Sequence, residues 1–177
     1  MLNIAFLFGT SAGLVMIAAM IAVIVASGGT PEFESHSLFL GYLIMIVALS
    51  TIFFAVKRYR DQELGGVIKF LPAFLVGLSV TIVAGIIYVL VWEVYMAATN
   101  YTFMDAYAAW MIEAERAKGA AGDVEKVIKE MEEAKAIYAN PFARVAITFI
   151  EIFPVGLLIA LISAAILRNP KALPQTA

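Results

Sequence analysis

The sequence predicts an all-α protein that crosses a membrane four times, and two observations support this. Apart from Glu151, no charged side chain occurs in four long apolar runs, at residues 4–26, 38–56, 70–92 and 145–167. At about 1.5 Å of rise per residue, a helical run of this length spans a hydrocarbon core of roughly 30 Å. The chain is also 63% hydrophobic and 15% charged, whereas soluble domains carry about 25% charged residues. We expect residues 1–177 to form one membrane domain.

The distribution of Lys and Arg between the spans predicts the orientation of the chain. The first connection, residues 27–37, contains neither residue, whereas the second connection, read as a loop over residues 57–69, contains Lys57, Arg58, Arg60 and Lys69. Cytoplasmic loops are enriched in Lys and Arg. We therefore expect the second connection inside and the first outside. An even number of spans then places both termini in the cytoplasm.

Residues 97–140, between the third and fourth runs, form the only sizeable polar insertion. Apolar residues recur at helical spacing on both sides of Gly119 and Gly122, and charged residues occupy the remaining positions. This pattern is typical of two amphipathic helices joined by a turn. The threading predicts that this helical hairpin lies on the extracytoplasmic side of the membrane. Its apolar faces either pack on each other and on the bundle, or offer a docking surface to a partner protein.

Small residues recur at close helical spacing in the apolar runs. Association of helices in lipid depends on close backbone approach, because lipid tails provide no hydrophobic drive. We expect these positions to pack the helices of one chain together, with homodimerisation through the first or third span as the alternative. The glycines concerned are Gly9, Gly13, Gly77, Gly85 and Gly156.

Glu151 is the strongest single candidate for a functional residue. It lies roughly 9 Å below the outer edge of the fourth run by helical rise, where a carboxylate is costly unless it is paired, protonated or hydrated. Pro154 follows one turn later and predicts a kink. We expect this segment to face the bundle. Glu151 then either fixes the register of the helix or binds a proton, a cation or a ligand; partners for the first role are Ser79, Thr81 and Tyr88.

Glu93 and Arg144 form the second candidate site. Glu93 follows the third run and Arg144 precedes the fourth. Both positions lie near the outer interface of the membrane, so the two side chains are expected to form an ion pair. Such a pair would pin the third helix to the fourth.

The composition also excludes several kinds of chemistry. The chain has no cysteine and one histidine, and its formal net charge is -2. These counts exclude thiol catalysis and thiolate metal sites, and they favour no nucleic-acid partner. The sequence contains no recognisable catalytic triad, phosphate-binding loop or zinc-binding histidine pair. We expect no enzymatic activity, no cofactor and no metal site.

Short motifs along the chain resemble the family catalogued as domain of unknown function 4199, a group of small bacterial membrane proteins without an assigned role. The resemblance implies four helices, with a polar insertion between the third and the fourth, and it implies no activity. The first run and the tail from Ala172 do not contribute to it. The motifs are Gly41–Met45, Ile52–Phe54, Lys57–Asp61, Gly65–Phe70, Tyr88–Trp92, Met131–Glu132, Tyr138–Pro141 and Phe149–Gly156.

Two functional hypotheses follow. The first is a non-enzymatic accessory or assembly protein of the bacterial inner membrane, which contacts membrane lipids and a membrane-protein partner or further copies of itself. The alternative is a small oligomeric transporter or channel in which Glu151 binds a proton or cation. A single four-helix unit has little room for an aqueous path, so the alternative requires an oligomer.

Overall fold

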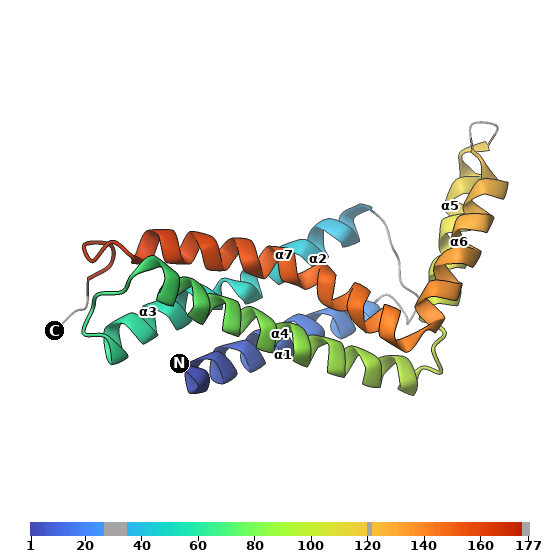
Figure 1. The fold of residues 1–177 in the computed structure, drawn as a ribbon. Coiled ribbons are helices and arrows are strands. Elements are labelled where there is room, and N and C mark those ends of the chain that lie inside the picture. The colour runs from blue at the N-terminus through green and yellow to red at the C-terminus, as the bar shows by residue number, and fades with distance from the viewer. Residues whose placement is uncertain (27–34, 120–121, 175–177) are drawn as a thin grey trace.

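The computed structural model describes residues 1–26, 35–119 and 122–174. Within these ranges the chain is helical and contains no β-strand. The helices are α1 (Leu2–Ala26), α2 (Ser35–Leu49), α3 (Thr51–Glu63), α4 (Phe70–Ala98), α5 (Phe103–Ala117), α6 (Val124–Ala139) and α7 (Pro141–Leu167) (Figure 1).

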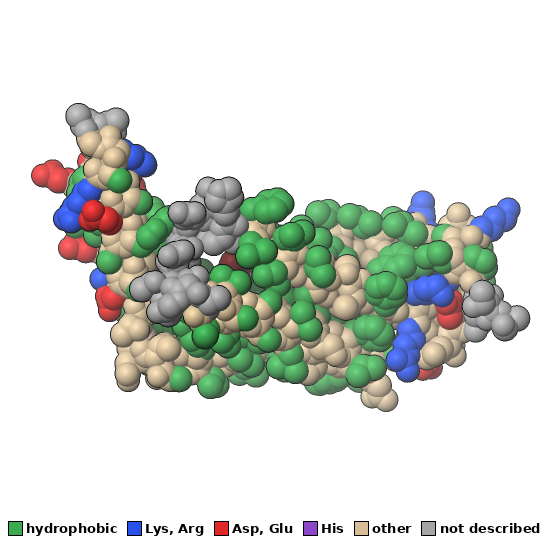
Figure 2. Space-filling model, turned by 180° about the vertical axis from the view of Figure 1, so that it is seen from behind, with side chains coloured by type: hydrophobic (Ala, Val, Ile, Leu, Met, Phe, Trp, Pro, Cys, Tyr) green, Lys and Arg blue, Asp and Glu red, His purple; other side chains and the backbone are tan. Residues whose placement is uncertain are grey.

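Four helical segments are long and apolar enough to cross a membrane. Large apolar side chains cover the surface of the bundle, and charged side chains gather at its two ends (Figure 2). The predicted class, an all-α protein with four spans, is therefore confirmed. The segments are Leu2–Val25, Phe39–Glu63, Phe70–Ala98 and Pro141–Leu167.

Helix α4 is the centre of the bundle, because α1 and α7 both pack along it. The glycines of α1 lie against α4. A Cβ atom added at Gly9 would lie 2.6 Å from Cβ of Val83, and one added at Gly13 would lie 2.8 Å from the carbonyl oxygen of Ala84. These distances are too short for real Cβ atoms, so both glycines let the two backbones approach closely.

The remaining candidate glycines lie between α4 and α7. A Cβ atom at Gly77 would lie 2.7 Å from Cβ of Ala160, and one at Gly85 would lie 2.7 Å from Cε2 of Phe149. At Gly156 an added Cβ atom would clash with the side chain of Thr81. All five glycines therefore lie at contacts within one chain, and a dimer built on them would have to separate α4 from its neighbours.

The second span differs from the expected single run, because it is divided at Ser50 into α2 and α3. The Ser50 hydroxyl donates to the carbonyl oxygen of Val47 over 2.6 Å, and the Thr51 hydroxyl donates to that of Ala48 over 2.7 Å. Hydroxyl groups that bond to the preceding turn compete with the helical ladder and bend helices. Two such residues in succession lie at the break, and the two helices together still form one span, Phe39–Glu63.

Helix α3 also corrects the sequence-based reading of the basic segment. Lys57, Arg58 and Arg60 were expected in a loop, but they lie on α3, which continues to Glu63. Ion pairs and hydrogen bonds four residues apart support the extra turns. Lys57 pairs with Asp61, and Arg58 donates to Gln62 over 2.9 Å. The change from apolar to polar residues after Val56 therefore marks the end of the apolar run, but the helix itself continues.

Helices α5 and α6 lie side by side and project from one end of the bundle (Figure 1). We call them the hairpin. An ion pair of 2.6 Å joins Lys135 of α6 to Asp105 of α5. Near the tip, the Glu115 carboxylate accepts from the backbone N–H of Asp123 over 3.1 Å. The hydrogen bond from the Lys118 ammonium, together with this backbone bond, holds the pKa of Glu115 below its usual value.

The start of α1 and the last described residues, 168–174, lie at the end of the bundle opposite the hairpin (Figure 1). A chain that crosses a membrane four times returns to the side on which it started, and this arrangement agrees with that. The first connection, which was predicted to be an outer loop, falls largely on residues 27–34, outside the described part of the chain.

Candidate functional site at the root of the hairpin

Four helix ends meet where the hairpin joins the bundle: the end of α4, the start of α5, the end of α6 and the start of α7. The start of α7 is fixed locally by its cap. The Asn140 side chain accepts from the backbone N–H groups of Phe142 and Ala143, over 2.9 Å and 3.3 Å. Pro141 occupies the first helical position, where its missing N–H is not needed. Arg144 therefore lies on the first turn of α7.

Glu93 and Arg144 form the expected ion pair, and it is bidentate. Nε of Arg144 donates to Oε1 of Glu93 over 2.7 Å, and Nη2 donates to Oε2 over 2.6 Å. The third guanidinium nitrogen, Nη1, donates to the backbone carbonyl oxygen of Tyr138 over 3.0 Å. The guanidinium thus joins α4, α6 and α7. The Arg144 side chain is 6% exposed and that of Glu93 is 25% exposed, so water screens the pair only weakly.

Aromatic rings surround this pair. The guanidinium carbon of Arg144 lies 4.9 Å from the centre of the Tyr101 ring, which is cation–π geometry. The Trp92 indole N–H donates to the Tyr138 hydroxyl over 2.8 Å, and the Trp92 ring meets Phe103 edge-on with 4.9 Å between centroids. Burial raises the pKa of Tyr138, so its hydroxyl stays neutral. The cluster fixes the direction in which the hairpin leaves the bundle.

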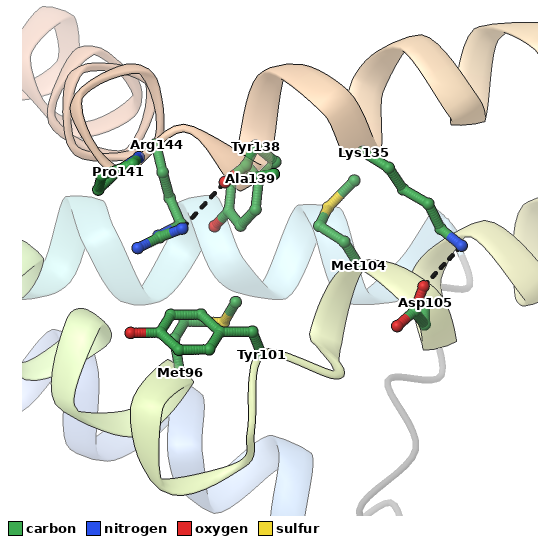
Figure 3. Close-up of a pocket in the computed structure, with 9 residues that line it drawn as sticks. All are labelled: Met96, Tyr101, Met104, Asp105, Lys135, Tyr138, Ala139, Pro141 and Arg144. Atoms are coloured by element: carbon green, nitrogen blue, oxygen red, sulfur yellow. Dashed lines mark hydrogen bonds and ion pairs between the residues drawn. The ribbon is translucent and has the colours of Figure 1, made fainter.

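The turn between α4 and α5 is strained, and this strain positions Tyr101. Asn100 and Tyr101 have φ angles of 51° and 57°, a left-handed conformation that is uncommon for residues other than glycine. The backbone N–H of Tyr101 donates to the carbonyl oxygen of Met96 over 2.8 Å. This tight return carries the Tyr101 ring beneath Arg144 (Figure 3). The turn could not be predicted from the sequence, because neither position is a glycine.

A pocket of about 490 Å³ opens beside the ion pair. In Figure 3, Arg144 lies at one end of the pocket and the pair formed by Lys135 and Asp105 lies at the other, with Tyr138 and Met104 between them. Sequence reasoning missed this pocket, because its walls come from four separate segments. Its lining residues are Met96, Tyr101, Met104, Asp105, Lys135, Tyr138, Ala139, Pro141 and Arg144.

Glu151 does not belong to this site, and its position corrects the expectation that it faces the bundle. Along α7 the buried residues recur every fourth position, as at Thr148, Ile152 and Gly156. Glu151 lies outside this row and is exposed on the apolar surface, as are Ile150 and Pro154. The helix continues through Pro154.

Of the three partners expected for Glu151, two bond elsewhere and the third, Tyr88, is close enough to interact with its charge. The hydroxyl groups of Ser79 and Thr81 donate to backbone carbonyl oxygens of their own helix, α4. Tyr88 contacts the sulfur atom of Met20, but it also interacts electrostatically with Glu151. Within the described ranges, Glu151 forms no hydrogen bond or ion pair with another side chain. Its interactions with Tyr88 and Tyr138 are electrostatic only, so no hydrogen bond or ion pair of Glu151 fixes the register of α7 within these ranges.

A second buried arginine, Arg60, lies at the opposite end of the bundle. Its side chain is fully buried. Nη1 donates to the carbonyl oxygen of Ala172 over 2.8 Å, Nη2 donates to that of Leu173 over 2.6 Å, and Nε donates to Asp61 over 2.7 Å. Arg60 thus holds the segment that follows α7 against α3. The sequence had assigned this residue only a role in topology.

The described residues contain no group of three or more His, Asp or Glu side chains arranged to hold a metal ion. Taken together, the fold and the site define an all-α membrane protein with four spans and a projecting hairpin fixed by a bidentate ion pair. The chain belongs to the family described as "Protein of unknown function (DUF4199)", which matches residues 7–169. No curated protein and no solved structure matches the chain.

Proposed function

We propose that this protein is a non-enzymatic accessory or assembly protein of a bacterial inner membrane, and that the hairpin docks its partner. The observation that carries the proposal is the exposure of the hairpin. Over their described lengths, α5 has one buried residue, Ala108, and α6 has none. Both helices are amphipathic by sequence. Most of the large apolar side chains of the two helices are half-buried and Ile137 is exposed, so part of this apolar surface is left for another protein.

The rigid root supports the same proposal. An element that only filled space would need no fixed direction, whereas the hairpin is joined to α4 and α7 by the Glu93–Arg144 pair and by the bond from Trp92 to Tyr138. Fixing a projecting element in advance lowers the entropy lost on binding. The distribution of Lys and Arg places the hairpin outside and both termini in the cytoplasm.

Site-specific photo-crosslinking in native membranes tests the docking role. A photoreactive residue at Glu132, which is exposed on α6, is expected to form one recurrent adduct with a second protein. The same residue at Arg58, which lies at the other end of the bundle on α3, is the matched control and is not expected to form that adduct.

A shortened hairpin gives the decisive comparison. Replacing residues 111–130 by a short Gly-Ser linker removes the outer parts of α5 and α6 and keeps Phe103, Tyr138 and the ion pair. The partner identified by crosslinking is expected to be lost from the purified complex, while the bundle stays folded. Full retention of that partner would refute docking through the hairpin.

The alternative function, a proton- or cation-linked transporter, has one observation in its favour. Glu151 lies on the apolar outer surface of α7, where a carboxylate is costly and is characteristic of an ion pathway. An oligomer would have to cover it. Equal proton and cation flux through the wild type and Glu151→Gln in proteoliposomes would exclude this acid from transport.

A further inference from the structure

The pocket at the hairpin root combines apolar walls with charged groups. Met96, Met104 and Pro141 provide the apolar part, and Arg144, Lys135 and Asp105 provide the charges. The pocket lies where the spanning segments Phe70–Ala98 and Pro141–Leu167 meet the hairpin. This level is the boundary between hydrocarbon and water. A ligand that fills the pocket therefore needs both an apolar part and a polar headgroup.

Arg144 has donors left for such a headgroup. A guanidinium carries five N–H groups. Two of them bond to Glu93 and one bonds to the carbonyl oxygen of Tyr138. One N–H on each terminal nitrogen therefore remains. Adjacent terminal nitrogens of arginine suit the oxygen atoms of a phosphate group.

The charges of the pocket cancel, and this cancellation selects the kind of headgroup. Glu93 balances Arg144, and Asp105 balances Lys135. A headgroup with a net negative charge therefore meets no surplus of positive charge. A zwitterion matches the pocket better, because its phosphate can reach Arg144 while its cation reaches Asp105. The Asp105 side chain is 70% exposed and has its second oxygen directed away from Lys135 (Figure 3).

The aromatic rings refine the choice of cation. A quaternary ammonium binds best over the face of an aromatic ring. Arg144 already lies over the Tyr101 ring, at 4.9 Å, and within 5.9 Å of the Tyr138 ring centre. A primary ammonium instead donates hydrogen bonds to a carboxylate, and Asp105 offers one.

We propose that this pocket binds the headgroup of a zwitterionic phospholipid that carries a primary ammonium group. The phosphate accepts hydrogen bonds from Arg144, the ammonium donates to Asp105, and the upper part of the lipid lies against Met96 and Met104. This proposal is independent of docking through the hairpin, since it concerns the root and not the exposed faces of α5 and α6.

Native mass spectrometry of the delipidated, detergent-purified protein tests the proposal. The probes are phosphatidylethanolamine, phosphatidylcholine and phosphatidylglycerol with identical acyl chains. We expect phosphatidylethanolamine to bind about tenfold more tightly than the other two, the equivalent of one charge-assisted hydrogen bond. Equal binding of the three lipids, or preference for phosphatidylglycerol, would overturn the proposal.

Two variants separate recognition from a structural role of the ion pair. Asp105→Asn removes the carboxylate and is expected to abolish the preference for phosphatidylethanolamine. Lys135→Gln breaks the same ion pair but leaves the carboxylate, so the preference is expected to persist. Equal loss in both variants would show that the pair only shapes the pocket, which would overturn the proposal. Glu132→Gln, an exposed change on α6, is the matched control.

Free phosphoethanolamine distinguishes a lipid from a soluble ligand. Without acyl chains it forgoes the contacts with Met96 and Met104, so it is expected not to displace the lipid at equal concentration. Complete displacement at that concentration would assign the pocket to a soluble molecule and would overturn the lipid assignment.

Discussion

The two ends of the bundle each contain a buried arginine, and the two are satisfied by different kinds of partner. Arg144, at the hairpin end, forms a bidentate pair with a carboxylate on another helix. Arg60, at the other end, donates to two backbone carbonyl oxygens and to its neighbour Asp61. Arg144 therefore joins spanning helices to one another, whereas Arg60 fastens the end of the chain.

This difference predicts different consequences when each arginine is removed. Loss of Arg144 leaves Glu93 as a partly buried charge without its partner, which is strongly unfavourable. Loss of Arg60 leaves carbonyl oxygens, and the released tail can turn these toward water. The hairpin end should therefore control the stability of the whole bundle, and the other end should control only the order of the tail.

Arg144→Ala is expected to give the largest effect. It should lower the free energy of unfolding by about 3 kcal/mol or more, because Glu93 loses a bidentate partner in a weakly screened site. Equilibrium unfolding in mixed micelles measures this change. Glu93→Gln combined with Arg144→Ala should recover part of the loss, because the double variant leaves no unpaired charge. A change below about 1 kcal/mol in the single variant would mean that the pair behaves as an exposed one.

Gly156→Val tests the packing of α7 against α4, at a position between the two arginine sites. The added side chain clashes with Thr81 on α4, and overpacking of this kind costs about 1–3 kcal/mol. The matched control is Gly41→Val, since an added Cβ at Gly41 meets nothing within 4 Å. The same unfolding experiment should separate the two variants, and equal stability would show that α7 can move away from α4 without penalty.

Arg60→Gln is expected to have a smaller and local effect. It should lower the global free energy of unfolding by about 1 kcal/mol, in proportion to the hydrogen bonds lost. The rate of backbone hydrogen exchange near residues 168–174 should rise, because the released tail opens locally. Unchanged exchange there, together with a large decrease in the global free energy of unfolding, would contradict the roles assigned to the two arginines.

Glu151→Leu is expected to have the smallest effect on the isolated chain. Glu151 is exposed and forms no hydrogen bond or ion pair within the described residues, so the free energy of unfolding should change by less than about 0.5 kcal/mol. Thermal unfolding of the purified protein measures this change. A loss comparable to that of Arg144→Ala would reveal a contact within the bundle and would contradict the outward position of this acid.

The fold class and the Glu93–Arg144 pair were predictable for the same reason. Charged side chains are rare in and near the apolar runs. The runs themselves are therefore easy to recognise, and opposite charges at the facing ends of two spans are readily predicted to pair. The partners of Arg60 were not predictable, because every residue has a carbonyl oxygen and the sequence does not distinguish Ala172 or Leu173 in this respect. The break at Ser50 was equally hidden, since a hydroxyl group in an apolar run does not reveal which carbonyl oxygen it will bond.

The outward position of Glu151 was missed for a different reason. Its depth in the membrane follows from counting residues, but its direction depends on which face of α7 meets α4. That face is set by the small residues Gly156 and Ala160, which fit against Thr81 and Gly77. The sequence contained this information, although the cost of a membrane-exposed carboxylate favoured the opposite orientation.

The central position of α4 also has a consequence for how the chain is assembled during synthesis. The glycines Gly9 and Gly13 emerge from the ribosome before the helix that receives them, which is the third span, α4. The first two spans therefore enter the membrane before their main packing surface exists. A nascent chain that stops before Phe70 lacks this surface, so we expect it to depend on chaperones or insertion machinery until α4 arrives.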